Sequence, residues 1–119
     1  MTNLIYTEFS FSLPKGFIDS EGNFHKKGKI RSATGEDEIV VSKNNRVRLE
    51  PSYNMFVILS RLITSLGTLS EVTPDELENL FLIDFYYLQN LYTQINQYPR
   101  GMMSLGEFLA TPWNSFIRR

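Results

Sequence analysis

The stretch DSEGNFHKKGKIR, residues 19–31, places Asp19, Gly22, His25, Gly28 and Arg31 three residues apart and holds the only histidine of the chain. Side chains repeat about every 2 residues along a strand and about every 3.6 along an α-helix, so this spacing fits neither element. Turn-forming residues separate short apolar and basic pieces. We interpret the stretch as very short strands joined by tight turns, with Gly22 and Gly28 at positive φ and the side chain of Asp19 or Asn23 bonded to nearby backbone.

A strand precedes this stretch. Between Ile5 and Leu13 the apolar and polar residues alternate, which is the period of a strand with one buried face. Pro14, Lys15 and Gly16 follow as a turn, because proline presets φ and glycine permits positive φ. We therefore predict that the strand ends at this turn, with Gly16 as a turn residue.

Helical patterns follow the stretch. Thr34 is a predicted N-cap, and three acidic residues come after it, where the helix dipole favours negative charge. A polar loop at 42–51 leads into a predicted helix that starts near Pro51 and stops at Gly67. Because its apolar surface is nearly continuous, we expect this helix to be the most buried.

The next helical segment opens with a capping box from Thr73 to Glu76 and has Pro74 at its first position. Apolar residues then recur every three or four positions to about Asn96, which predicts one continuing face. Asp84 interrupts this face. It either caps a new helix that begins at residue 85 or is a partly buried carboxylate with a partner, and we favour the cap because a short acidic side chain suits that role.

These elements predict one α+β domain at residues 1–97 of the 119-residue chain. An N-terminal β-strand and short β-hairpin elements in a β-rich half, 1–50, pack on a C-terminal bundle of two to three helices, 51–97. Residues 98–119 combine proline and glycine breaks with apolar residues. We interpret them as a C-terminal docking segment that contacts either its own domain or a partner.

Residue types that carry chemistry are scarce. The chain has no cysteine and one histidine, which excludes disulfides and the usual zinc ligand set. The oxygen-bearing side chains of residues 19–23 match the start of a calcium-binding loop, but Phe24 replaces the required glycine and Ile30 the bidentate glutamate. No catalytic pattern stands beside His25. We predict no enzymatic activity, no cofactor, no metal and no small-molecule substrate, and a structural role for His25 in a turn or at a strand end.

The charge and hydropathy patterns bear on partners and location. Lys26, Lys27, Lys29 and Arg31 could contact phosphates, but the net charge of −1 and the lack of interleaved aromatic residues disfavour a nucleic acid. Charge that guards an edge strand explains the lysines equally well. The first residues lack a basic region, and the longest apolar run is far below the ~20 residues that span a bilayer. We expect a cytoplasmic protein with no membrane partner.

A set of residues stands out by its order along the chain. In the first half these are Leu13-Pro14-Lys15-Gly16, Asp19, Gly22, His25, Gly28, Arg31, Ala33-Thr34 and Asp37-Glu38-Ile39. In the second half they are LSRLITSLG at 59–67, Pro74, LF at 80–81, Asp84, YLQ at 87–89, Tyr92 and IN at 95–96. From about Phe9 to Asn96 this combination resembles a small family encoded among phage-tail-like genes and, more loosely, phage tail assembly chaperones.

The resemblance implies a protein of contractile phage tails or extracellular contractile injection systems that assists assembly by binding another tail component, with no enzymatic activity. The partner would be a tube, spike-hub or tape-measure protein, and a homo-oligomer is also compatible. Some relatives end in a cysteine-rich metal-binding tail, from which this chain departs because it has no cysteine.

Two alternatives to an assembly chaperone or adaptor stay open. The first is a permanent structural subunit of the tail tip or baseplate, and the second, more distant, is a nucleic-acid-binding regulator that uses the basic cluster. For a binding role, the large apolar and aromatic residues of the helices and the docking segment are the candidate partner contacts. They are Phe56, Phe81, Tyr86, Tyr87, Tyr92, Met102, Met103, Phe108, Trp113 and Phe116.

Overall fold

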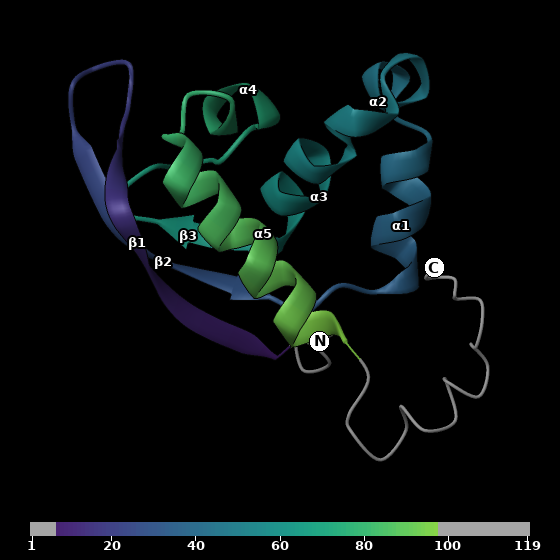
Figure 1. Cartoon of the computed structure of the whole chain (residues 1–119), viewed down its shortest axis with the longest axis horizontal. Helices are drawn as coiled ribbons and strands as arrows, with labels where there is room; N and C mark the ends of the chain where they lie inside the picture. Colours follow the sequence, from purple (N-terminus) through teal and green to yellow (C-terminus); the bar gives the residue numbers. More distant parts are fainter. Residues whose placement is uncertain (1–6, 98–119) are drawn as a thin grey trace.

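A long β-hairpin forms the first layer of the molecule in the computed structural model, which describes residues 7–97 (Figure 1). Strands β1, Glu8–Ile18, and β2, Phe24–Arg31, pair antiparallel. The prediction that the first strand ends at Pro14 is wrong, because β1 continues through a bulge between Ser12 and Phe17. Proline is tolerated there since β1 is an edge strand of the sheet.

The predictions for the glycines have different outcomes. Gly16 in the bulge and Gly22 in the hairpin turn have positive φ, 111° and 86°, as predicted. Asp19 bonds nearby backbone as expected, since its Oδ1 accepts hydrogen bonds from the N–H groups of Glu21 and Asn23, both at 2.9 Å. The prediction for Gly28 is wrong: it lies inside β2 and not in a turn. Its lack of a side chain is needed for packing instead, because a Cβ would overlap the Phe11 ring and a backbone oxygen of the neighbouring strand.

The predicted helix from Pro51 to Gly67 is three elements. A single 3₁₀ turn η2, Pro51–Tyr53, leads into α3, Asn54–Leu62, and the chain then extends as β3, Ile63–Leu66. β3 pairs antiparallel with β2, which gives a three-stranded sheet of order β1-β2-β3. Gly67 has positive φ, 59°, and begins the turn after β3 rather than ending a helix.

Four further helices complete the described fold. Thr34 and Thr73 are confirmed as N-caps, of α1, Gly35–Ser42, and of α4, Pro74–Leu77, which has the predicted capping box. The predicted polar loop contains α2, Asn45–Leu49, because Asn44 accepts a hydrogen bond from the third helical N–H. The longest helix is α5, Leu82–Asn96.

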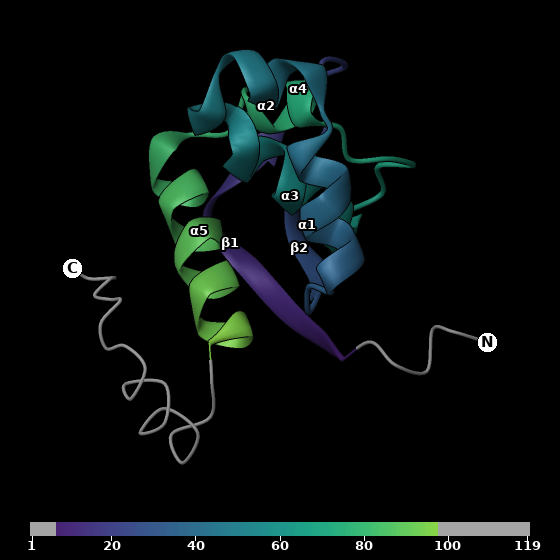
Figure 2. The ribbon, with the colours of Figure 1, turned by 90° about the vertical axis from the view of Figure 1, so that its right-hand side faces the viewer.

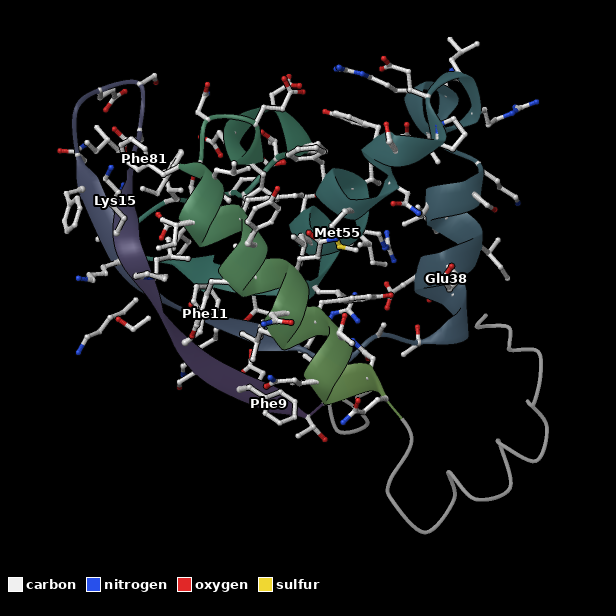
Figure 3. All side chains as sticks on the ribbon, viewed as in Figure 1. Phe9, Phe11, Lys15, Glu38, Met55 and Phe81 are labelled. Atoms are coloured by element: carbon white, nitrogen blue, oxygen red, sulfur yellow. The ribbon has the colours of Figure 1, made fainter. Side chains whose placement is uncertain are left out.

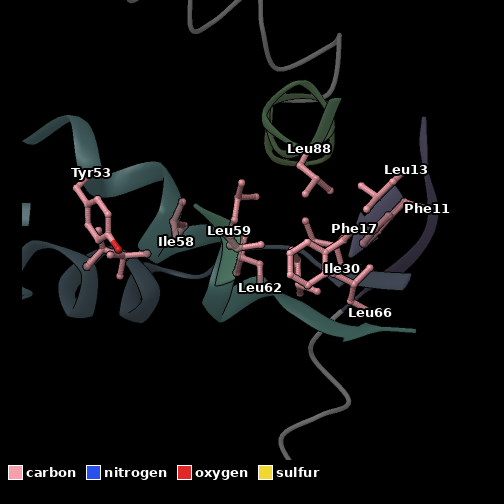
Figure 4. Packing of buried hydrophobic residues seen from close by; sticks show 14 residues of the cluster. Phe11, Leu13, Phe17, Ile30, Tyr53, Ile58, Leu59, Leu62, Leu66 and Leu88 are labelled. Atoms are coloured by element: carbon pink, nitrogen blue, oxygen red, sulfur yellow. The ribbon is translucent and has the colours of Figure 1, made fainter. Parts of the chain in front are cut away.

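The helices cover one face of the sheet, and α3 lies between α1 and α5 (Figure 2). Leu13, Ile30, Leu59, Leu62 and Leu88 are each 0% exposed and come from β1, β2, α3 and α5 (Figure 4). The β-rich and helical halves therefore share a single core. The predicted α+β class is confirmed.

Candidate interaction surface

The polar residues of the opening stretch are engaged inside the fold. His25 is 4% exposed, and its Nε2 lies 2.8 Å from Asp19 Oδ2. Its Nδ1 accepts the N–H of Thr68 at 3.3 Å, so Nε2 carries the proton and donates to Asp19. This hydrogen bond is the main cause that lowers the pKa of Asp19. His25 thus joins the start of β2 to the turn after β3, and neither ring nitrogen is left over for catalysis.

Arg31 belongs to a cluster of charged side chains around a buried carboxylate. Its guanidinium donates two hydrogen bonds of 2.8 Å to the carboxylate of Asp37, which is 1% exposed. Arg61 Nε donates a third bond, at 2.9 Å, and the N–H of Thr34 donates a fourth, at 2.8 Å. The Arg31 hydrogen bonds hold the pKa of Asp37 well below its usual range. The cluster ties β2, α1 and α3 together.

The prediction that Asp84 caps a helix is wrong. The N-cap of α5 is Phe81, and Asp84 lies in the first turn with 0% exposure. Its two carboxylate oxygens accept the N–H groups of Lys15 and Gly16 at 2.8 and 2.9 Å. These donors belong to the β1 bulge, where the ladder to β2 is interrupted. The alternative of a buried carboxylate with a partner is therefore the one that the structure has.

The lysines and the arginine of the basic cluster differ in their exposure to solvent. Lys26, Lys27 and Lys29 are exposed, whereas Arg31 reaches the buried Asp37. Their explanation as guards of an edge strand is wrong, because β2 is the central strand of the sheet. Lys27 and Lys29 lie with Ser10 and Ser65 around a shallow depression on the sheet.

An apolar surface remains where α5 begins beside the hairpin. We call it the α5–hairpin surface; its large side chains are 40 to 64% exposed and are Phe81, Leu82, Ile83 and Tyr86. The surface meets the hairpin at the bulge, where Lys15 Nζ lies 4.0 Å from the centroid of the Phe81 ring (Figure 3). Two further exposed apolar residues, Ile18 and Phe24, pair with each other on the face of the hairpin away from the helices, because their neighbours Phe17 and His25 are buried. A separate exposed group, Ile39, Val40 and Leu49, lies on α1 and α2.

The solvent side of α5 has no charge. The helix, LIDFYYLQNLYTQIN, contains one charged residue, Asp84, and that residue is fully buried. The exposed positions beyond Tyr86 are amides and hydroxyls, and a depression beside Tyr86 is lined by Gln89, Asn90 and Thr93. Charged residues are depleted at the centres of protein interfaces, and aromatic residues are enriched there.

The predicted partner residues of the helices have different surroundings. Phe81 and Tyr86 belong to the α5–hairpin surface. Phe56 is partly buried and stacks on Phe85 with centroids 4.7 Å apart. Tyr87 is partly buried, and its hydroxyl accepts the N–H of Ser12 at 3.4 Å. Tyr92 is also partly buried, and burial raises its pKa.

The other predicted contacts, Met102, Met103, Phe108, Trp113 and Phe116, lie outside the described residues, as does the whole docking segment. The sequence reasoning missed Leu82 and Ile83. A signal for both was present: once Asp84 and Leu88 point inward, residues 82 and 83 lie on the opposite side of a helix.

Comparison of the chain with models of protein families, with curated proteins and with solved structures gives no match. Within residues 7–97 no three or more acidic, histidine or cysteine side chains gather where they could hold a metal ion. In the same range no helix has the length and apolar character needed to cross a membrane.

Proposed function

We propose that this chain is an assembly chaperone or adaptor that binds another component of a contractile phage tail or injection system through the α5–hairpin surface. The tail context rests on the ordered resemblance described above. The binding role rests on one observation, an exposed apolar surface on a helix without exposed charge. The partner would be a tube, spike-hub or tape-measure protein.

The size of the surface supports a protein partner. Four large side chains at 40 to 64% exposure present on the order of 400 Å² of mainly apolar surface, if a large side chain offers about 200 Å². The largest apolar patch of a typical monomer is about 300–600 Å² and is often functional. One side of a standard protein interface buries about 800 Å², so this surface would supply most of its apolar part.

The anchoring of the surface supports a preformed site. Asp84 fixes the first turn of α5 to the β1 bulge from inside, while Leu82, Ile83 and Tyr86 extend outward from the same turns. The polar motif residues Asp19, His25, Arg31 and Asp37 are satisfied by internal partners. Their role is therefore to shape the molecule, and their polar groups are not available to bind a partner.

Co-expression with the neighbouring tail genes tests the proposal. The intact chain should co-purify with one tail protein, Ile83→Asp should lose that complex, and Leu49→Asp should keep it, because Leu49 is 84% exposed but lies on α2 away from the surface. Absence of any complex, or an Ile83→Asp variant that binds normally, would sink the proposal. Mass spectrometry of sheathed particles separates the two structural roles: a chaperone is absent, whereas a permanent subunit is present in stoichiometric amount.

A lysine variant separates the nucleic-acid alternative. Lys27→Ala with Lys29→Ala removes two exposed positive charges of the sheet and leaves the α5–hairpin surface unchanged. This variant should retain the tail partner. Salt-sensitive binding of a nucleic acid that the double variant loses would instead favour a regulator.

A further inference from the structure

The charge that borders the α5–hairpin surface is positive, because Lys15 extends over the Phe81 ring. Lys26 is also exposed, but it lies with Phe24 on the other face of the hairpin, opposite the buried His25. α5 adds no exposed charge. The nearest acidic groups along the chain face elsewhere, since Glu78 accepts hydrogen bonds from Arg46 and Tyr53.

The acidic residues of the hairpin turn also face away from this surface. Asp19 and Glu21 line a depression together with residues 68–70, beside the turn after β3. A second copy of the chain would therefore bring Lys15 of both molecules to one interface with no carboxylate of the surface between them. Like charges brought together in this way disfavour self-association.

The edge of β1 beside α5 is closed to an added strand. A partner strand needs free backbone N–H and C=O groups, but the N–H of Ser12 already donates to Tyr87 Oη. Those of Lys15 and Gly16 already donate to Asp84. An incoming strand would have to break these bonds, so a helix suits this surface better.

The exposed side of α5 suits helix packing. Leu82, Tyr86 and Asn90 are four residues apart and form one ridge of the helix, and the depression lined by Tyr86, Gln89 and Thr93 runs beside it. Helices pack when side chains of one enter the grooves between the ridges of the other. A 15-residue helix offers about 22 Å of length, or about four turns, for such a contact.

We infer that the α5–hairpin surface binds an amphipathic helix of another protein whose apolar stripe is bordered by acidic residues. The apolar stripe packs on Leu82, Ile83 and Tyr86, and the acidic border lies against Lys15. This inference rests on the proposed function for its setting, because it defines the chemistry of the tail component that the adaptor captures.

Two helical peptides with the same Leu and Phe stripe test the inference, one flanked by Glu and the other by Lys. They are titrated into the full-length, ¹⁵N-labelled chain at low salt, and amide shifts and affinity are measured. The Glu-flanked peptide should shift the amides of residues 82–90 and of Lys15. It should bind about fivefold more tightly than the Lys-flanked peptide, the difference expected for one rim charge that attracts one peptide and repels the other.

Variants of exposed residues sharpen the test. Ile83→Asp should weaken the Glu-flanked peptide at least about tenfold, as for a central contact, whereas Leu49→Asp should leave its affinity unchanged. The change Lys15→Glu should reverse the preference between the peptides. Lys43→Glu, an exposed lysine at the end of α1, is the matched control and should not.

Equal affinity for both peptides, or shifts confined to α1 and α2, would overturn the inference. Self-association of the free chain that Ile83→Asp abolishes would also overturn it and would make a second copy the occupant. The proposed function fails separately: if the peptides behave as expected but no tail protein co-purifies, the helix site stands without the tail context. If a tail protein co-purifies and the change of lysine to glutamate does not weaken that complex, the proposed function stands and the inferred helix site is wrong.

Discussion

Asp84 brings a carboxylate into the interior in order to bind two backbone donors. Lys15 and Gly16 lie in the β1 bulge, where the strand ladder offers no acceptor, and both carboxylate oxygens accept their N–H groups. The position in the first turn of α5 adds a favourable interaction with the helix dipole. One side chain therefore joins two segments that are 68 residues apart.

Asp84→Asn tests this link, because the amide is nearly the same size but can accept through only one of its two terminal atoms. The other N–H is left facing a donor in a buried site, so we expect a loss of about 2–3 kcal/mol in the free energy of unfolding. Urea denaturation measures it. Asn90→Ala, on the exposed side of the same helix, should change stability by less than about 0.5 kcal/mol. A similarly small effect of Asp84→Asn would contradict the argument.

Asp37 makes stability depend on pH through its two arginine partners. Because its pKa is lowered in the folded protein, the unfolded chain takes up a proton first, so the stabilisation is fully present above the unfolded value of about 3.9. It is lost as the pH falls from there through the folded pKa. At neutral pH, Asp37→Asn should cost about 3 kcal/mol, since it leaves Arg31 and Arg61 facing a neutral group.

Denaturation curves at several pH values measure this dependence. The difference between the intact chain and Asp37→Asn should be constant from about pH 7 to 5 and should shrink below about pH 4. Asp19 has a lowered pKa as well, but it is present in both proteins and so cancels from the difference. A difference that stays constant at acidic pH would show that the carboxylate charge is not the source of the stability.

At the scale of elements, the central strand depends on close packing at Gly28. Its backbone has no positive φ, so Ala would normally be acceptable there, yet a Cβ would overlap Phe11 and the backbone oxygen of Ser65. We expect Gly28→Ala to destabilise the fold by about 2 kcal/mol through overpacking. Gly35→Ala, at the start of α1 with open space around it, should be neutral or stabilise by about 0.5 kcal/mol. Thermal melts of both variants and of the intact chain measure these changes. Equal melting temperatures of the two variants would refute the role assigned to close packing at Gly28.

The elements show which local signals suffice for prediction. The caps at Thr34 and Thr73 and the turn at Gly22 were predictable because the determining atoms lie within a few residues. The continuation of β1 through Pro14 was not, since its support comes from the distant Asp84. β3 was missed for a related reason: apolar residues 62, 63 and 66 fit a helix as well as a strand, and only the pairing with β2 distinguishes them.

The same distinction applies to the candidate surface at the scale of the whole molecule. Aromatic composition alone pointed to Phe81 and Tyr86 but also to Phe56 and Tyr87, which are partly buried against the core. To separate the two groups one must know which sides of α3 and α5 face the core, and contacts between the elements determine this. Sequence therefore predicts that apolar residues are in excess, and the packed fold determines which of them face solvent.

The described fold also predicts where the chain can be shortened. Asn96, the last residue of α5, accepts the N–H of Ala33 and donates to the carbonyl of Tyr92, both at 2.9 Å. Residues 1–97 keep this link, so we expect them to unfold cooperatively. A chain ending at Ile95 should be less stable than the 1–97 chain by about 1 kcal/mol, the contribution of such a bond. Urea denaturation of the two truncated chains measures the difference.

The truncation at residue 97 tests the docking segment at the same time. If residues 98–119 contact the tail component, the 1–97 chain should lose co-purification with it while keeping its fold, because the apolar residues of the segment then add contact area that the α5–hairpin surface lacks. Circular dichroism of the truncated chain verifies the fold, and Leu49→Asp in the full chain serves as a binding-competent control. A 1–97 chain that binds as tightly as the full chain would restrict the interface to the α5–hairpin surface and remove the role assigned to the segment.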